Sequence, residues 1–194
     1  MRPILTVAVA SLAIVITACQ KQAETNAVIT NDMMMNDTKT NDMSTAAGMA
    51  LAPMAAKDFA STIAASDMFE IASGKIAKTM AGNEACRKFG AMLAADHTKS
   101  SAKLKNAAAD ASPPVTLPTT LPVDLQAKLD ALKAVKGAAF DTLFLEQQKD
   151  GHSKALNALK SYSSSGDVVS LKSFANNAAP VVQAHLDMLN SMKM

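Results

Sequence analysis

The feature that most constrains the fold is a helical spacing of apolar side chains over the last two thirds of the chain. From about residue 58 onward, apolar residues recur every three or four positions in four long segments, and no segment alternates strictly enough to predict a strand. Alanine, leucine, lysine and methionine are frequent here, and these residues lose little conformational freedom in a helix. We therefore expect an all-α protein.

Prolines, glycines and capping residues divide this region into four long helices and one short one. Asp58, Asp124 and Asp167 are the expected N-caps of the first long helix, the short helix and the last long helix. A Pro-rich segment over residues 113–122 predicts an extended connection before the short helix. The expected helices span about residues 58–80, 84–109, 124–135, 137–162 and 167–192. This pattern predicts a four-helix bundle with a Pro-rich crossover and a short extra helix.

The N-terminus has the plan of a secretory signal peptide. Arg2 precedes an apolar run over residues 4–16 that is too short for a transmembrane helix. The sequence Ile16-Thr17-Ala18-Cys19 resembles the bacterial lipobox, whose cysteine is acylated, and acyl chains on Cys19 would anchor the protein in a membrane. We expect residues 1–18 to be a signal peptide, residues 19–57 a lipidated disordered tether, and residues 58–194 the folded domain. Gln20 favours the outer membrane of a Gram-negative host, with the domain facing the periplasm.

Composition disfavours several classes of function. The net charge is +2, no basic stripe is visible, and the chain has no Trp and one Tyr, so we expect no nucleic-acid partner. The chain has no nucleophile–base pair with a supporting motif, no phosphate-binding loop and no CxxC, which disfavours an ordinary hydrolase or oxidoreductase. Besides the membrane, an unidentified envelope protein or an apolar ligand stays open as a partner.

Cys86 is the second of the two cysteines. Its place in the first turn of a helix would lower its thiol pKa. It also shares a face with Phe89 and Leu93, and we favour a role as a small buried apolar residue.

Polar residues on the apolar helix faces are the candidate functional residues. At 100° per residue, all three histidines of the chain fall on core faces, each on a different helix, and Glu70 does so on the remaining long helix. Asp96 lies at the edge of such a face, and Asp141 lies within one. The candidate set is therefore Glu70, Asp96, His97, Asp141, His152 and His185. If both short turns lay at one end, Glu70, His97 and His152 would share one level and His185 would lie about two turns away.

Several segments of the expected helices carry a family resemblance. They are Asp67-Met68-Phe69-Glu70-Ile71-Ala72, Met92-Leu93-Ala94-Ala95-Asp96-His97-Thr98-Lys99, Gly137-Ala138-Ala139-Phe140-Asp141, Gly151-His152-Ser153-Lys154-Ala155-Leu156 and Ala184-His185-Leu186. Together these segments resemble the domain of unknown function 4142 family of extracytoplasmic bacterial proteins. The resemblance implies a ferritin-like bundle and an envelope location. It does not imply a particular activity. The ferritin-like superfamily also suggests a di-iron carboxylate site. This chain departs from that pattern, because Ala94 and Val182 stand three residues before His97 and His185, where a glutamate is needed.

Two interpretations give the core residues a role, and a third makes the bundle a binding module for an envelope partner or an apolar ligand, with the histidines incidental. In the first, the protein is a non-catalytic envelope lipoprotein in which Asp96 or Glu70 holds an imidazole and the polar network fixes helix register. In the second, His97, His152, Glu70 and in some arrangements His185 bind one Zn or Cu ion, because neutral imidazoles suit both metals.

Overall fold

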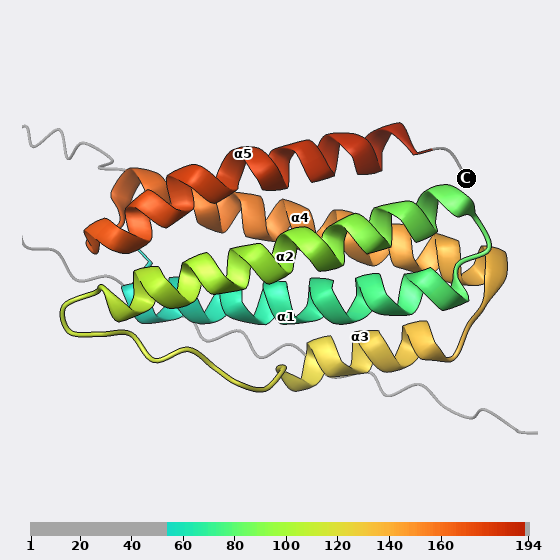
Figure 1. The fold of residues 1–194 in the computed structure, drawn as a ribbon, viewed down its shortest axis with the longest axis horizontal. Coiled ribbons are helices and arrows are strands. Elements are labelled where there is room, and N and C mark those ends of the chain that lie inside the picture. Colours follow the sequence, from blue (N-terminus) through green and yellow to red (C-terminus); the bar gives the residue numbers. More distant parts are fainter. Residues whose placement is uncertain (1–53, 193–194) are drawn as a thin grey trace, which may run out of the picture. The chain divides into compact units, whose positions relative to one another are not determined.

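The structure is a computed structural model that describes residues 54–192, which form five α-helices (Figure 1). They are α1 (Ala56–Met80), α2 (Glu84–Ala109), α3 (Val123–Lys133), α4 (Gly137–Ser165) and α5 (Val169–Ser191). The described region has no strand beyond an isolated bridge between Ala81 and Gly137, so the predicted all-α class is confirmed. No helix in this region has the length and apolar character needed to cross a membrane. The predicted signal peptide, Cys19 and almost all of the predicted tether lie outside the described residues.

The four long helices lie alongside one another, and α3 packs on the outside against α1 and α4 (Figure 1). α1 packs against α2 and α4, while α5 packs against α4 and α2, so the four helices surround a shared interior. The segment containing α3 returns the chain to the end where α1 meets α2, and the Ala81–Gly137 bridge joins the two connections there. The α1–α2 and α4–α5 turns therefore lie at opposite ends, in an arrangement compatible with the predicted four-helix bundle.

Three helix starts differ from the predicted N-caps. α1 begins two residues before Asp58, and Asp124 lies inside the first turn of α3. α5 begins after Asp167, whose carboxylate accepts a hydrogen bond from the Tyr162 hydroxyl at 3.0 Å. For Asp58 and Asp124 the local pattern does not separate the N-cap from the first turn, because an acidic side chain in the first turn also favours a helix through its dipole. Asn83 does cap α2, because its side chain accepts a hydrogen bond from the backbone N–H of Ala85 at 2.8 Å.

The interior contains two apolar clusters separated by a layer of polar side chains. The cluster near the α4–α5 turn includes Phe59, Leu104, Tyr162 and Phe174. The cluster near the α1–α2 turn includes Phe89, Leu93, Phe140, Phe144 and Leu189. Between the two clusters lie the buried side chains of Asp67, Glu70, Ser73, His97, Gln148, His152 and His185. We call these seven residues the polar layer.

Close packing of α1 on α2 forms one wall of this layer. A Cβ atom at Gly74 would overlap the carbonyl oxygen of Gly90, and a Cβ atom at Gly90 would overlap Ala77. The two backbones therefore approach more closely than side chains would allow. This contact holds the polar residues of α1 against those of α2.

We predict that the thiol of Cys86 is unreactive in the folded protein. The side chain is buried, and burial together with the nearby Asp141 carboxylate raises the pKa of Cys86 from 9.0 to about 11. At neutral pH this lowers the thiolate fraction about 100-fold. In the Cys19→Ser chain, N-ethylmaleimide should label native protein at least about 100-fold more slowly than urea-unfolded protein. Similar labelling rates in the two states would contradict the prediction.

Candidate metal centre

Three histidines from three helices meet in the polar layer. His97 comes from α2, His152 from α4 and His185 from α5, and each is at most 5% exposed. Their ring centroids lie 5.5 to 5.7 Å apart in all three pairs. One ligand nitrogen of each ring lies within 4.8 Å of the others. The side chains are thus arranged as a nearly equilateral triangle across the interior.

An aspartate on α1 orients His97. Its Nδ1 atom lies 2.7 Å from Oδ1 of Asp67, and both side chains are buried. The second oxygen of Asp67 accepts a hydrogen bond from Ser101 at 3.3 Å. Because a carboxylate accepts, Nδ1 of His97 carries the proton in this bond and Nε2 is left as the free nitrogen.

The other two rings are oriented in the same manner. His152 donates from Nδ1 to the backbone carbonyl of Gln148 at 2.8 Å, since a carbonyl oxygen can only accept. His185 donates from Nε2 to Oδ2 of Asp96 at 3.4 Å. The remaining ring nitrogens have no hydrogen-bond partner within the described protein: Nε2 of His97, Nε2 of His152 and Nδ1 of His185. In each neutral ring, this nitrogen carries the lone pair that a metal ion requires.

The electrostatic setting keeps two rings neutral. Burial and the neighbouring His97 lower the pKa of His152 to about 3 and also lower the pKa of His185. Burial alone would lower the pKa of His97 as well, but the hydrogen bond that His97 donates to Asp67 and the nearby carboxylates outweigh burial and raise this pKa. His152 and His185 are therefore available as ligands at neutral pH. At His97, a metal ion and a proton compete for the same ring nitrogen.

Glu70 lies beside the triangle. Its Oε1 atom is 3.8 Å from Nδ1 of His152, and neither carboxyl oxygen has a hydrogen-bond partner in the described protein. Burial raises the pKa of Glu70 to about 8, so the group is mostly neutral at pH 7. Because the pKa of His152 is about 3, this contact joins two neutral groups and is not an ion pair.

The sequence-predicted residues divide into three groups. The structure brings together His97, His152 and His185, and places Glu70 beside them. Asp96 holds His185 from the edge of the layer, and its other oxygen pairs with Lys99 at 3.1 Å. Asp141 lies at the α1–α2 turn, where its oxygens accept hydrogen bonds from the backbone N–H groups of Gly82 (3.1 Å) and Asn83 (2.8 Å).

Asp67 is the residue that sequence reasoning missed. It holds His97, a role that the sequence led us to expect of Glu70 or Asp96. A signal for it existed, because Asp67 is four residues after Ile63 and three before Glu70, and this spacing places all three on one helix face.

Phe89 closes the triangle on the side of the α1–α2 turn. Its ring centroid lies 6.4 Å from that of His152 and 6.3 Å from that of His185, with an edge contact to the latter. The histidines are therefore backed by apolar surface there, which lowers the local dielectric and limits access of water.

Comparison with known proteins identifies a family. A family model described as Domain of unknown function (DUF4142) matches residues 40–192, which is most of the chain. No curated protein and no solved structure matches the chain.

We predict that Asp141 stabilises the turn between α1 and α2. Asp141→Ala removes the acceptor for two backbone N–H groups and should lower the free energy of unfolding by about 1–3 kcal/mol. Asp141→Asn keeps one acceptor oxygen and should cost less. Urea denaturation measures both effects, with Glu146→Ala, an exposed acidic residue inside α4, as the control. A loss no larger than that of the control would contradict this role.

We predict that Glu70 makes stability fall as pH rises. The unfolded carboxyl ionises near 4.5, whereas burial keeps the folded one protonated up to a pKa of about 8. Below pH 4.5 Glu70 is protonated in both states, and its contribution to the free energy of unfolding is complete. Between the two pKa values this contribution declines by about 1.4 kcal/mol per pH unit. In chelator-treated protein, Glu70→Gln should remove this decline, whereas the exposed Glu146→Gln should keep it. Parallel pH profiles for wild type and Glu70→Gln would refute the prediction.

Proposed function

The chain belongs to the DUF4142 family, and we propose that its helical domain binds one transition-metal ion, Zn²⁺ or Cu²⁺, through His97, His152 and His185. The observation that carries this proposal is the convergence of three buried ring nitrogens, each belonging to a ring whose other nitrogen is held by an oxygen. Imidazole nitrogens suit both metals.

Distances support a single shared ion. Ligand nitrogens around a tetrahedral Zn²⁺ are about 3.3 Å apart, given Zn–N bonds of about 2.0–2.1 Å. One nitrogen from each of the three rings lies within 4.8 Å of those from the other two, so side-chain shifts of about 1 Å would close the site. Three protein ligands leave a fourth position open, as in catalytic rather than structural zinc sites.

The oxygen partners supply what metal-bound histidines require. A metal-ligating histidine usually donates its second ring N–H to a carboxylate or a backbone carbonyl, which fixes the tautomer and the ring orientation. His97, His185 and His152 find such partners in Asp67, Asp96 and the Gln148 carbonyl.

A purely structural polar network explains the same residues less well. Such a network stabilises a core when its members are satisfied, and a buried unpaired polar atom costs about 1–3 kcal/mol. Here three ring nitrogens, both oxygens of Glu70 and the side-chain oxygen of Gln148 have no partner within the described protein. Binding of an ion would satisfy the three nitrogens at once.

A di-iron centre is not supported by this donor set. Glu70 is the one glutamate in the polar layer, and burial keeps it mostly protonated. Such centres need carboxylates from several helices to balance the charge of two iron ions.

The proposal for location rests on the sequence alone. We propose that Cys19 is acylated and that the domain is displayed from the outer membrane toward the periplasm. The lipobox-like residues 16–19 and the polar segment that follows support this assignment.

We predict that the untagged full chain carrying Cys19→Ser contains one metal ion per chain by elemental analysis. His97→Ala and His152→Ala should each reduce the metal content at least about tenfold, because removing a ligand leaves two. Asp67→Asn should weaken metal affinity by about 10–100-fold, because it removes the carboxylate that orients His97. The exposed Asp124→Asn is the matched control.

Thermal unfolding provides an independent measurement. Added Zn²⁺ or Cu²⁺ should raise the melting temperature of chelator-treated protein, since a ligand that binds the native state stabilises it. Protein that is purified without metal and whose melting temperature is unchanged by either ion would overturn the proposal.

A further inference from the structure

A groove between α2 and α5 leads to the histidine triangle. It has a volume of about 770 Å³, and both His97 and His185 line it. His152, on α4, does not line it and lies behind the other two rings. A second cavity, beneath the Pro-rich connection, contains none of the three histidines. The α2–α5 groove is therefore the side from which a ligand could reach the open position of an ion held by the triangle.

The groove is far larger and longer than an ion requires. Its α2 wall extends from His97 to Asp110 and its α5 wall from His185 back to Ser170. At about 1.5 Å per residue, each wall is roughly 20 Å long. The shape fits an elongated molecule that lies along the two helices with one end at the histidines.

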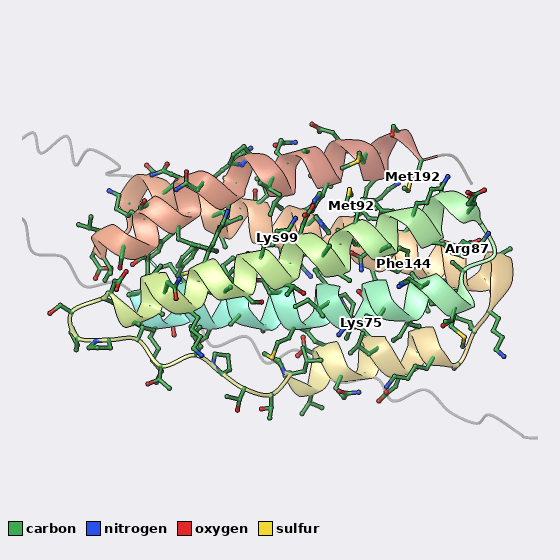
Figure 2. All side chains as sticks on the ribbon, in the orientation of Figure 1. Lys75, Arg87, Met92, Lys99, Phe144 and Met192 are labelled. Atoms are coloured by element: carbon green, nitrogen blue, oxygen red, sulfur yellow. The ribbon has the colours of Figure 1, made fainter. Side chains whose placement is uncertain are left out.

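Charge along the groove is uneven. Asp96 and Lys99 line the α2 wall at the histidine end, Lys103 lies near its middle, and Asp110 lies at the far end (Figure 2 labels Lys99). Lys99 pairs with Asp96, while Lys103 is exposed and forms none of the ion pairs found among residues 54–192. A bound divalent ion would add positive charge at the histidine end. Because Asp96 offsets Lys99, the positive charge that favours an anionic group at that end would come from the bound ion, with Lys103 roughly 9 Å along the helix from His97.

The floor of the groove between its two ends is apolar. Phe174 and Val182 are buried there, and Ala178 lies between them in sequence on the same wall. Asn106 and Asn177 line the rims, with side chains exposed to solvent. An aliphatic chain would contact the floor, and the rims would remain hydrated.

We propose that the α2–α5 groove binds a medium-chain organic carboxylate whose head group occupies the open position of the metal ion. This inference rests on the proposed metal site. Carboxylate oxygens are established ligands of Zn²⁺, and the aliphatic body would bury apolar surface over Phe174 and Val182.

Calorimetric titration of the full chain carrying Cys19→Ser tests the proposal, with octanoate as the probe and acetate as the short reference. Octanoate should bind Zn²⁺-loaded protein at least about tenfold more tightly than metal-free protein, which corresponds to about 1.4 kcal/mol. Acetate, which lacks the aliphatic body, should bind more weakly than octanoate. The zinc content of every sample is measured in parallel.

Two pairs of variants separate the groove from the metal site. Asn177→Trp fills the groove from an exposed position and should weaken octanoate binding at least tenfold while zinc content stays unchanged. Its matched control is Asn176→Trp, an exposed neighbour that does not line the groove. Lys103→Glu should also weaken octanoate binding, whereas Lys105→Glu, whose side chain lines the other cavity, should not.

The outcomes distinguish this inference from the proposed function. Zinc-loaded protein that does not bind octanoate, or binds it as tightly without metal, overturns the groove proposal and leaves the metal site intact. Equal effects of Asn177→Trp and Asn176→Trp also overturn it. Protein that binds no metal overturns both proposals.

Discussion

The constraint on which the structure depends is the burial of three imidazole rings in a helical interior that is otherwise largely apolar. Burying an unpaired ring nitrogen costs free energy, so each ring needs a hydrogen-bond acceptor supplied by the protein. Asp67, the Gln148 carbonyl and Asp96 meet this need from α1, α4 and α2. Each bond satisfies one nitrogen and fixes the direction of the other. The packing of the four long helices therefore determines where three lone pairs meet.

The polar layer also divides the interior into regions with different roles. The apolar clusters on either side provide most of the buried hydrophobic surface. The layer contributes less to stability, because several of its polar atoms have no partner within the described protein. Each unpaired buried atom of this kind requires an explanation, and a bound ion is one. His97 and His185 line the groove between α2 and α5, so this groove adjoins the part of the interior that holds the unpaired polar atoms.

Local patterns predicted much of the fold. The spacing of apolar residues predicted the helical class, and the bounds predicted for the second helix agree with α2. The N-caps at Asp58, Asp124 and Asp167 were wrong. Asp58 and Asp124 lie in the first turn of their helices, where an aspartate is also favourable, whereas Asp167 precedes the N-cap of α5 and accepts a hydrogen bond from Tyr162. The favoured interpretation of Cys86 as a small buried residue is confirmed, whereas the lowered thiol pKa expected from its place at a helix start is not. A helix start lowers a thiol pKa only while the side chain is hydrated, and here burial and Asp141 raise it.

The sequence by itself determined which side chains face the interior, since that depends on the 100° turn between neighbouring residues of one helix. All three histidines and Glu70 could be placed there from this rule alone. Only the tertiary structure decided which of them meet. The axial level of a residue depends on how the helices are connected, and the crossover through α3 places the two short turns at opposite ends. His185 consequently lies level with His97 and His152, and Asp67 holds His97. These contacts join residues on different helices, so no periodicity within one segment could specify them.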